Sequence, residues 1–335
     1  MTATSTSTVT DQPRTMRAIG APRIGALDKL GPVEVQPPSL TAGHVQVRVV
    51  ASAVNPADLK IHRGEFAGRV LHARTTPLVT GFDFSGVVEA CGDGVVDFAA
   101  GDSVFGFLPY SSSNRQGAFA ERVVVDPAMI ARKPQSITHE VAGAVATPGC
   151  TALQALRDKG RLREGGRVMI LGAAGGVGSV AVGVARSLGA KVTAVCSTYA
   201  VDFVRELGAD EVIDRKQQDP LAAKGPFEVV FDTAAAYSYA STRHMLTSDG
   251  AYVTTLPSAA WFGGKILAAA SKRRCHMIIV ASRRADLELL ATWMAGGMRV
   301  PIDSRFPVRE LGKALERQGR GEVRGRVAID VENGF

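Results

Sequence analysis

A glycine-rich segment between a predicted strand and a predicted helix is the part of the sequence best suited to chemistry. It reads Gly-Ala-Ala-Gly-Gly-Val-Gly over residues 172–178, after the apolar run 167–171 and at the start of a helical pattern over 176–188. Glycines let the backbone approach a pyrophosphate and let the helix pack on the strand, and a helix N-terminus presents N–H groups and a positive dipole to phosphates. We predict a dinucleotide site formed by Ala174, Gly175, Gly176, Val177 and Gly178.

The segment departs from the G-x-G-x-x-G pattern because Ala173 takes the place of its first glycine. A tight turn between a strand and a helix in any α/β protein is the alternative interpretation. The preceding strand, the following helix and a second strand about 20 residues further on favour the dinucleotide.

The end of that second strand indicates which dinucleotide is bound. NAD sites usually carry Asp or Glu there to hydrogen-bond the ribose hydroxyls, whereas this sequence has Cys196 followed by Ser197. A carboxylate would repel a 2′-phosphate, so its absence favours NADPH over NADH. Ser197 could donate to the phosphate, and Arg215, after the third strand, could reach it as a cation. Arg215 could equally be an ordinary surface arginine.

The elements that must position this site change in character near Pro134. Before it, short strand-like runs are punctuated by Gly, Pro and Asp, which is typical of an antiparallel β-rich domain. These runs are 45–49, 85–90, 104–107 and 122–125. After it, strands alternate with helices as in a parallel, doubly wound sheet. We expect the helical run 137–155 to be interrupted around Pro148–Gly149, and a last strand over 275–281.

The composition indicates a folded protein with a sizeable core. Its 335 residues are 46% hydrophobic and 21% charged, which suits two domains. The formal net charge is +7, but basic residues are spread along the chain, with short clusters only at 272–274 and 320–326. The 6% aromatic content offers no platform for stacking bases. We therefore expect an anionic cofactor or substrate, and no nucleic acid partner.

Cysteine spacing and hydropathy bear on the compartment. The four cysteines are scattered and show no C-x-x-C spacing, which fits a reducing compartment. No stretch approaches the ~20 apolar residues that span a bilayer. Residues 1–14 are rich in Ser and Thr and lack the apolar region of a secretory signal. We expect a cytoplasmic protein with no membrane partner and a flexible tail over 1–14.

Several short segments, in their order and spacing, give the chain a family resemblance. Besides the glycine turn they are V-N-P-A-D at 54–58, P-L-V-T-G-F-D-F-S-G-V-V at 77–88, G-D-S-V-F-G at 101–106, G-A-F-A-E at 117–121, G-C-T-A at 149–152 and L-G-A-D-E-V-I-D at 207–214. Together they make the chain resemble a zinc-free medium-chain dehydrogenase/reductase of the quinone oxidoreductase group, over residues 16–331.

The resemblance implies an α/β architecture in two parts. A GroES-like, β-rich catalytic domain would comprise 15–134 and 281–335, and a doubly wound Rossmann cofactor domain would comprise 135–280. It also implies an active site in the cleft, a homodimer, and hydride transfer from NADPH to a quinone or an α,β-unsaturated carbonyl compound.

The resemblance also assigns individual residues. Asn55 matches an asparagine beside the nicotinamide, and Thr151 matches a threonine near the cofactor. Leu256 lies on the loop that reaches the nicotinamide ring, and Arg326 stands where relatives often have a lysine that touches the cofactor. The sequence has Tyr199 where some relatives place a basic residue, so fewer cationic side chains are available to bind the 2′-phosphate.

Zinc-dependent members of the wider family carry a Cys in the early loop and a Gly-His-Glu segment later. This sequence has Asn-Pro-Ala-Asp at 55–58 and Gly-Phe-Asp at 81–83, and it lacks the four-cysteine structural lobe. No tetrahedral set of N and S ligands can be assembled, so we expect no metal. We interpret Asp83 as a buried hydrogen-bonding residue rather than a catalytic one.

The predicted mechanism needs a hydrogen-bond donor for the developing enolate and a proton for the product. Tyr110 is the candidate, although it could instead only pack at the rim of the pocket, with water supplying the proton. Trp261 and Phe262 could form an apolar wall for a flat substrate or a dimer contact. The alternatives to a quinone or enone reductase are a trans-acting enoyl-thioester reductase of polyketide-type biosynthesis and a non-catalytic NADPH-binding protein.

Overall fold

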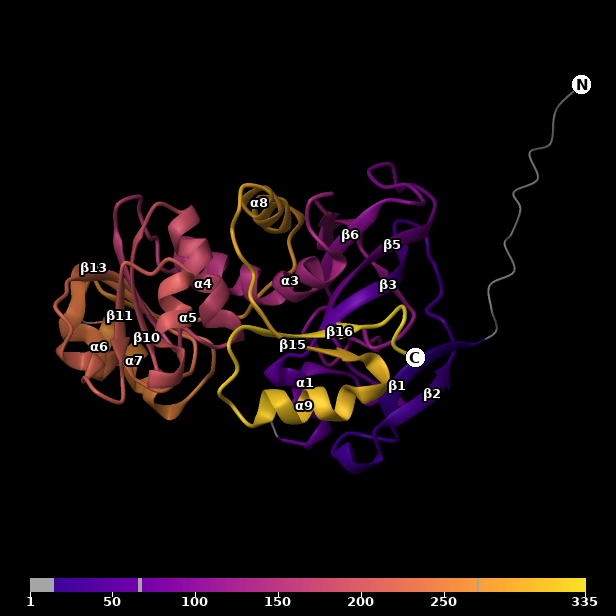
Figure 1. Cartoon of the computed structure of the whole chain (residues 1–335), viewed down its shortest axis with the longest axis horizontal. Coiled ribbons are helices and arrows are strands. Elements are labelled where there is room, and N and C mark those ends of the chain that lie inside the picture. The colour runs from indigo at the N-terminus through magenta and orange to yellow at the C-terminus, as the bar shows by residue number, and fades with distance from the viewer. Residues whose placement is uncertain (1–14, 66–67, 270) are drawn as a thin grey trace, which may run out of the picture.

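The computed structural model describes residues 15–65, 68–269 and 271–335, and the tail predicted for residues 1–14 lies outside them. In this described part, the strands form a small sheet and two larger ones. Helix α3 (His139–Leu153) runs between the two larger sheets, packing on strands of one and on helix α4 of the other (Figure 1).

One large sheet is parallel throughout and carries the predicted dinucleotide turn. Its strand order is β11-β10-β9-β12-β13-β14. The strands are β9 (Arg167–Leu171), β10 (Lys191–Cys196), β11 (Glu211–Asp214), β12 (Phe227–Asp232), β13 (Leu246–Thr254) and β14 (Arg274–Met277). Helices α4 (Gly176–Ser187), α5 (Val201–Glu206), α6 (Tyr239–Thr242) and α7 (Ala259–Ala269) connect them. Apolar runs between glycine turns, buried on both faces, produce this sheet, and the predicted doubly wound fold is confirmed.

The other large sheet joins the two ends of the chain. Its order is β15-β16-β3-β5-β6-β8, with β7 also paired to β3. The strands are β3 (Val45–Ala53), β5 (Asp83–Cys91), β6 (Ser103–Phe107), β7 (Arg122–Val125), β8 (Ile130–Arg132), β15 (Ile302–Pro307) and β16 (Arg326–Asp330). Antiparallel pairing of Ala328 with Ala53 brings the C-terminal strand β16 beside β3. This pairing places Arg326 next to the loop that contains Asn55.

The remaining elements cover this sheet. The small sheet has the order β2-β1-β4. Its strands are β1 (Met16–Ala21), β2 (Gly31–Val35) and β4 (Leu78–Val79), and the helices are α1 (Pro56–His62), α2 (Gly68–Leu71), α8 (Arg284–Ala295) and α9 (Leu311–Gly319). The boundaries of the two predicted domains stay a prediction.

The last strand of the parallel sheet is shorter than predicted. β14 ends at Met277 rather than near residue 281, because Met277 pairs with Thr254, where β13 itself ends. A strand without a neighbour to bond has no reason to continue.

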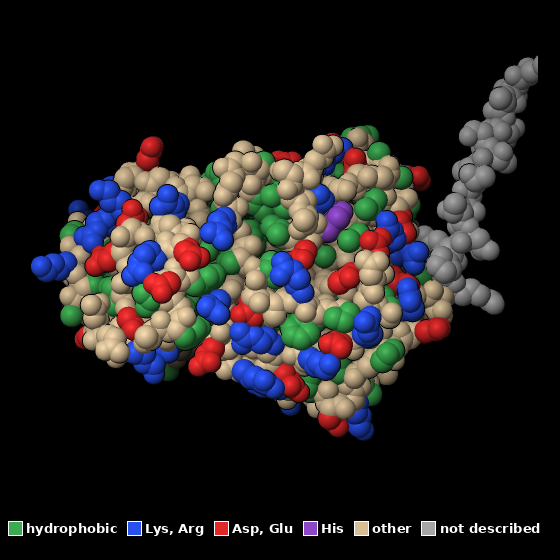
Figure 2. Space-filling view, viewed as in Figure 1, with side chains coloured by type: hydrophobic (Ala, Val, Ile, Leu, Met, Phe, Trp, Pro, Cys, Tyr) green, Lys and Arg blue, Asp and Glu red, His purple; other side chains and the backbone are tan. Residues whose placement is uncertain are grey.

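Basic and acidic side chains share the face of the molecule that Figure 2 draws. Figure 2 shows Lys and Arg side chains interspersed with Asp and Glu over the face in view. Within residues 15–65, 68–269 and 271–335, no helix combines the length and the apolar character that crossing a bilayer requires.

Candidate active site

The glycine turn between β9 and α4 has the geometry of a phosphate cradle. Gly175 is the N-cap of α4 and offers no side-chain hydrogen bond to the first helical amides, which have no acceptor within the helix. A Cβ at Gly178 would lie 2.2 Å from the Gly172 carbonyl oxygen, so the close packing of α4 requires glycine. Among the described residues, a Cβ at Gly175 would meet only that same oxygen, at 3.6 Å. The space above the helix N-terminus therefore fits the paired phosphates of a dinucleotide.

A pocket of about 530 Å³ extends from this turn along the carboxyl ends of β9 and β10. Residues 174–176 line it together with Ser197 and Arg215. Arg215 donates a hydrogen bond from Nε to Ser197 Oγ at 2.9 Å. The structure thus brings the two residues predicted to bind a 2′-phosphate into one pocket with the turn. Val177 and Gly178 follow the turn on α4 and are not part of the pocket wall.

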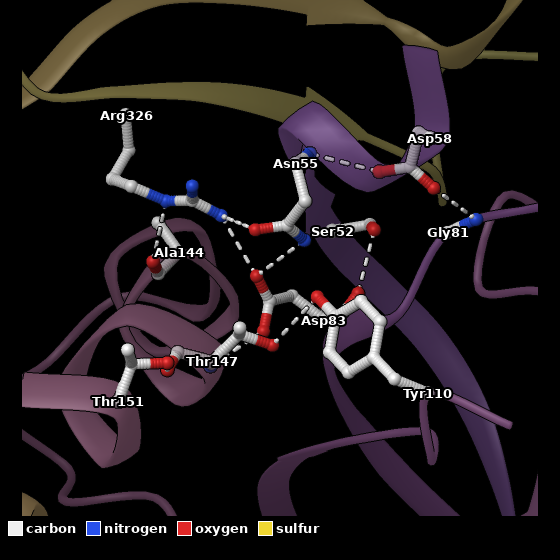
Figure 3. A network of polar contacts seen from close by, with 10 residues as sticks. All are labelled: Ser52, Asn55, Asp58, Gly81, Asp83, Tyr110, Ala144, Thr147, Thr151 and Arg326. Atoms are coloured by element: carbon white, nitrogen blue, oxygen red, sulfur yellow. Dashed lines mark hydrogen bonds and ion pairs between the residues drawn. The ribbon is translucent and has the colours of Figure 1, made fainter. Parts of the chain in front are cut away.

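A buried polar cluster lies next to the turn, with Asp83 at its centre (Figure 3). Asp83 Oδ2 accepts from Arg326 Nη2 at 2.7 Å and from Asn55 Nδ2 at 3.0 Å, and Oδ1 accepts from the Thr147 N–H at 2.6 Å. Arg326 also donates to Asn55 Oδ1 at 3.1 Å and from Nε to the Ala144 carbonyl at 2.9 Å. The side chains of Asp83 and Arg326 are 0% and 2% exposed. All of these partners donate to Asp83, so it is held as an anion beside the guanidinium.

Helix α3 supplies two of these contacts, and a proline within the helix accounts for one of them. The predicted interruption at Pro148 is wrong, since α3 continues through Pro148 to Leu153. Pro148 lacks the N–H that would bond the Ala144 carbonyl, and Arg326 Nε donates to that carbonyl instead. The adjacent Thr147 N–H donates to Asp83. The proline thus frees a backbone group that the buried ion pair uses.

Asp58 fixes the two loops that carry Asn55 and Asp83. Its carboxylate accepts from the backbone N–H of Asn55 at 2.8 Å and from that of Gly81 at 2.9 Å. Burial raises the pKa of Asp58 to about 7, against the opposing effect of these two hydrogen bonds. In Asp83, burial also raises the pKa, and the Arg326 guanidinium acts in the opposite direction.

Tyr110 lies at the edge of the cluster. Its ring stacks on Phe82 with centroids 4.0 Å apart, and its hydroxyl donates to Thr147 Oγ1 at 3.3 Å. Burial, followed by the charges of Asp83 and Asp58, holds the pKa of Tyr110 well above its usual range. The phenol therefore keeps its proton at neutral pH and is an O–H donor.

The other predicted site residues lie in different surroundings. Thr151 on α3 is 6% exposed, and its Oγ1 donates to the carbonyl one turn earlier. Leu256 follows β13 and is 39% exposed. Asn55 and Arg326 point into the cluster and bond each other there. Arg326 Nη1 lies 3.1 Å from where a Gly176 Cβ would be, so a cofactor contact of Arg326 would have to come through Nη1.

Sequence reasoning missed part of this cluster. It did not single out Thr147 or the Ala144 carbonyl. The expected buried hydrogen-bonding role of Asp83 is confirmed, but Arg326 was not predicted as its partner. One signal was available: a proline inside an apolar helical run leaves the carbonyl four residues earlier without its helical donor.

The segments that correspond to zinc ligands in related enzymes have other contacts here. Phe82 stacks on Tyr110, and Asp83 pairs with Arg326. In the described ranges 15–65, 68–269 and 271–335, no group of three or more His, Cys, Asp or Glu side chains could hold a metal ion. Metal independence stays a prediction.

Comparison with known families gives matches to both halves of the chain. The alcohol dehydrogenase GroES-like domain matches residues 41–135, and the zinc-binding dehydrogenase model matches residues 207–329.

Individual relatives cover most of the chain. The mitochondrial NAD(P)H oxidoreductase RTN4IP1 of Homo sapiens is 33% identical over 86% of this chain and 81% of its own length. The trans-enoyl reductase pgmF of Aspergillus terreus is 30% identical over 88% of each protein. The solved structure of the quinone oxidoreductase from Coxiella burnetii superposes with a TM-score of 0.84 at 27% identity, covering 95% of this chain and 100% of that one. This chain therefore belongs to the medium-chain dehydrogenase/reductase family and is an NAD(P)H-dependent oxidoreductase of that family.

Proposed function

We propose that this chain is an NADPH-dependent, metal-free reductase that transfers a hydride to a quinone or an α,β-unsaturated carbonyl compound. The observation that carries the proposal is the glycine turn at the N-terminus of α4, which shares one pocket with Ser197 and Arg215. The names of the relatives, which include a quinone oxidoreductase and a trans-enoyl reductase, support the substrate class.

The choice of NADPH rests on the end of β10. Ser197 Oγ is positioned by Arg215 Nε, and together they offer a hydroxyl and a cation to a 2′-phosphate. The acidic side chain in the pocket wall, Glu322, lies between α9 and β16 rather than at the end of β10. A carboxylate that would bind ribose hydroxyls and repel the phosphate is thus missing from its usual place.

The bound cofactor supplies the hydride, and the protein binds it, orients it and excludes water. Reduction of a conjugated carbonyl places negative charge on its oxygen, and Tyr110 would donate its O–H to that oxygen in place of Thr147 Oγ1. Because its pKa is raised, Tyr110 donates a hydrogen bond and does not act as a strong acid. Water then supplies the proton, to the α-carbon of a reduced enone or to the oxygen of a reduced quinone. Asn55 is hydrogen-bonded to Asp83 and Arg326, and these bonds fix its side chain in the part of the site that would lie beside the cofactor.

A trans-acting enoyl-thioester reductase is the second candidate, favoured by the name of the Aspergillus terreus relative. Turnover of enoyl thioesters that exceeds turnover of free enones and quinones would select it.

The first experiment measures NADPH and NADH consumption with a panel of quinones, enones and enoyl thioesters. Tight NADPH binding without turnover of any acceptor would overturn the proposal in favour of a non-catalytic NADPH-binding protein.

The nucleotide preference is tested with Ser197→Asp, which should weaken NADPH at least tenfold and NADH far less, because the carboxylate faces the 2′-phosphate. Thr198→Asp is the matched control: it adds the same charge one residue later, at an exposed position outside the pocket wall. Equal losses of both cofactors in Ser197→Asp would refute the placement.

We also propose a homodimer. Phe262 and Ile266 on α7 are 61% and 78% exposed, and Ile279, just after the edge strand β14, is 74% exposed. Trp261 packs against Phe262 with ring centroids 4.7 Å apart, which extends this apolar surface. Light scattering should give a dimer mass for the wild type and a monomer mass for Ile266→Asp.

A cytoplasmic location stays a prediction, supported by four free thiols.

A further inference from the structure

A second pocket lies at the amino ends of the strands of the parallel sheet, whereas the glycine turn lies at their carboxyl ends. It has a volume of about 340 Å³, within the range of small-molecule sites. The lining residues come from the segment before β9 and from the amino ends of β12, β13 and β14. They are Gly160, Arg161, Arg163, Glu228, Thr247, Asp249, Gly250, Lys272 and Arg274. Because all strands of this sheet are parallel, the pocket is separate from the dinucleotide site at the carboxyl ends.

The pocket wall has an excess of positive charge. Four basic side chains face two acidic ones. Arg163 is neutralised by Glu228, with Nη2 2.7 Å from Oε1. Asp249 accepts from Thr247 Oγ1 at 3.1 Å. Within the described ranges, the side chains of Arg161 and Lys272 form no ion pair or hydrogen bond.

Arg274 is held rigidly at the edge of this pocket. Its Nη2 donates to the Gly160 carbonyl at 3.1 Å and to the Asp249 carbonyl at 2.9 Å. Its Nη1 is buried and meets no hydrogen-bond partner in the part of the chain that the structure describes. Burial, together with the like charge of Arg161, lowers the pKa of Arg274. An anion in the pocket would offset this repulsion.

We propose that this pocket binds a small dianion, a phosphate monoester, held by the side chains of Arg161 and Lys272, with the positive charge of Arg274 beside it. The excess of two positive charges matches a dianionic phosphate, and arginine and lysine are the usual partners of phosphate oxygens. The basic cluster at 272–274, which the cofactor site does not use, thereby acquires a role. This phosphate site does not depend on the proposed reductase reaction at the carboxyl ends of the strands.

Calorimetry tests the proposal on the full chain saturated with NADPH, so that the phosphate sites of the cofactor pocket are filled. Glycerol 3-phosphate, inorganic phosphate and, as an ionic-strength control, sodium chloride are titrated separately. We expect saturable binding of glycerol 3-phosphate and none of chloride. Tighter binding of glycerol 3-phosphate than of phosphate would identify an organic phosphate as the ligand. Equal binding would identify the phosphate group itself, which also supports the site.

Two substitutions place the binding in this pocket. Arg161 has φ +52°, a left-handed conformation that glycine adopts readily, so Arg161→Gly keeps the fold. The double variant Arg161→Gly, Lys272→Ala should bind glycerol 3-phosphate at least tenfold more weakly than the wild type. Lys265→Ala removes one exposed charge from α7 outside the pocket and should leave the affinity unchanged. Absence of saturable binding, unchanged affinity in the double variant, or an equal loss in Lys265→Ala would overturn the proposal.

Discussion

Gly175→Ala separates cofactor binding from folding at the glycine turn. Gly175 has φ −72° and ψ 176°, which alanine adopts without strain. Its new Cβ would meet only the Gly172 carbonyl oxygen among the described residues, at 3.6 Å, which is an ordinary contact. The unliganded protein should therefore keep its melting temperature. With the dinucleotide bound, the methyl group would stand where the pyrophosphate approaches the first amides of α4.

The expected loss follows from the hydrogen bonds that the methyl group displaces. One hydrogen bond to a charged group contributes about 1.5–3 kcal/mol, so NADPH should bind roughly 10–100-fold more weakly, as measured by fluorescence titration. Gly178→Ala is the comparison. Its Cβ would lie 2.2 Å from the Gly172 oxygen and 2.8 Å from Ala173 Cα. Such overpacking against backbone should cost about 1–3 kcal/mol of stability. Wild-type NADPH affinity in Gly175→Ala would refute the placement of the phosphates.

Three further substitutions probe the polar cluster and its surroundings. Arg326→Met should lower the free energy of unfolding by about 3–5 kcal/mol because it leaves the Asp83 carboxylate buried without its cation. In chemical denaturation, the double variant with Asp83→Asn should lose less stability than the sum of the two single variants. Strictly additive losses would contradict a direct interaction between the two side chains. Tyr110→Phe should reduce kcat about 100-fold with little change in NADPH affinity, and an unchanged kcat would assign Tyr110 to packing alone. Burial lowers the pKa of His62 to about 4, so its contribution to stability is present above pH 6.5 and is lost as the pH falls towards 4. Relative to His62→Gln, the wild type should lose about 3 kcal/mol over that interval, and parallel pH profiles would show that His62 does not titrate in this way.

The parallel sheet was predictable because its signals are local. The apolar run 167–171 coincides with β9, and the glycine turn and α4 start where the pattern placed them. Each of these elements depends on neighbours in sequence: a buried strand needs a continuous apolar run, and a helix start needs a residue whose backbone can turn.

The polar cluster was not predictable in the same way, because its partners are far apart in the chain. Arg326 bonds a carbonyl 182 residues earlier and a carboxylate 243 residues earlier. Local propensity treats Pro148 as a helix breaker, and only tertiary contacts show that Ala144 and Thr147 find other partners. The expected buried hydrogen-bonding role of Asp83 is confirmed, but its ion-pair partner was not predictable, because Arg326 lies on the last strand of the chain.

Arg326 lies between the polar cluster and the glycine turn, the two parts of the proposed active site. Its Nη2 and Nε hold Asp83, Asn55 and helix α3, while Nη1 lies 3.1 Å from the position that a Cβ at Gly176 would take in the glycine turn. We therefore expect a change in the cluster that moves the guanidinium to alter the packing against the glycine turn as well. Loss of the buried ion pair should appear in cofactor affinity as well as in stability, which a purely structural salt bridge away from the turn would not produce.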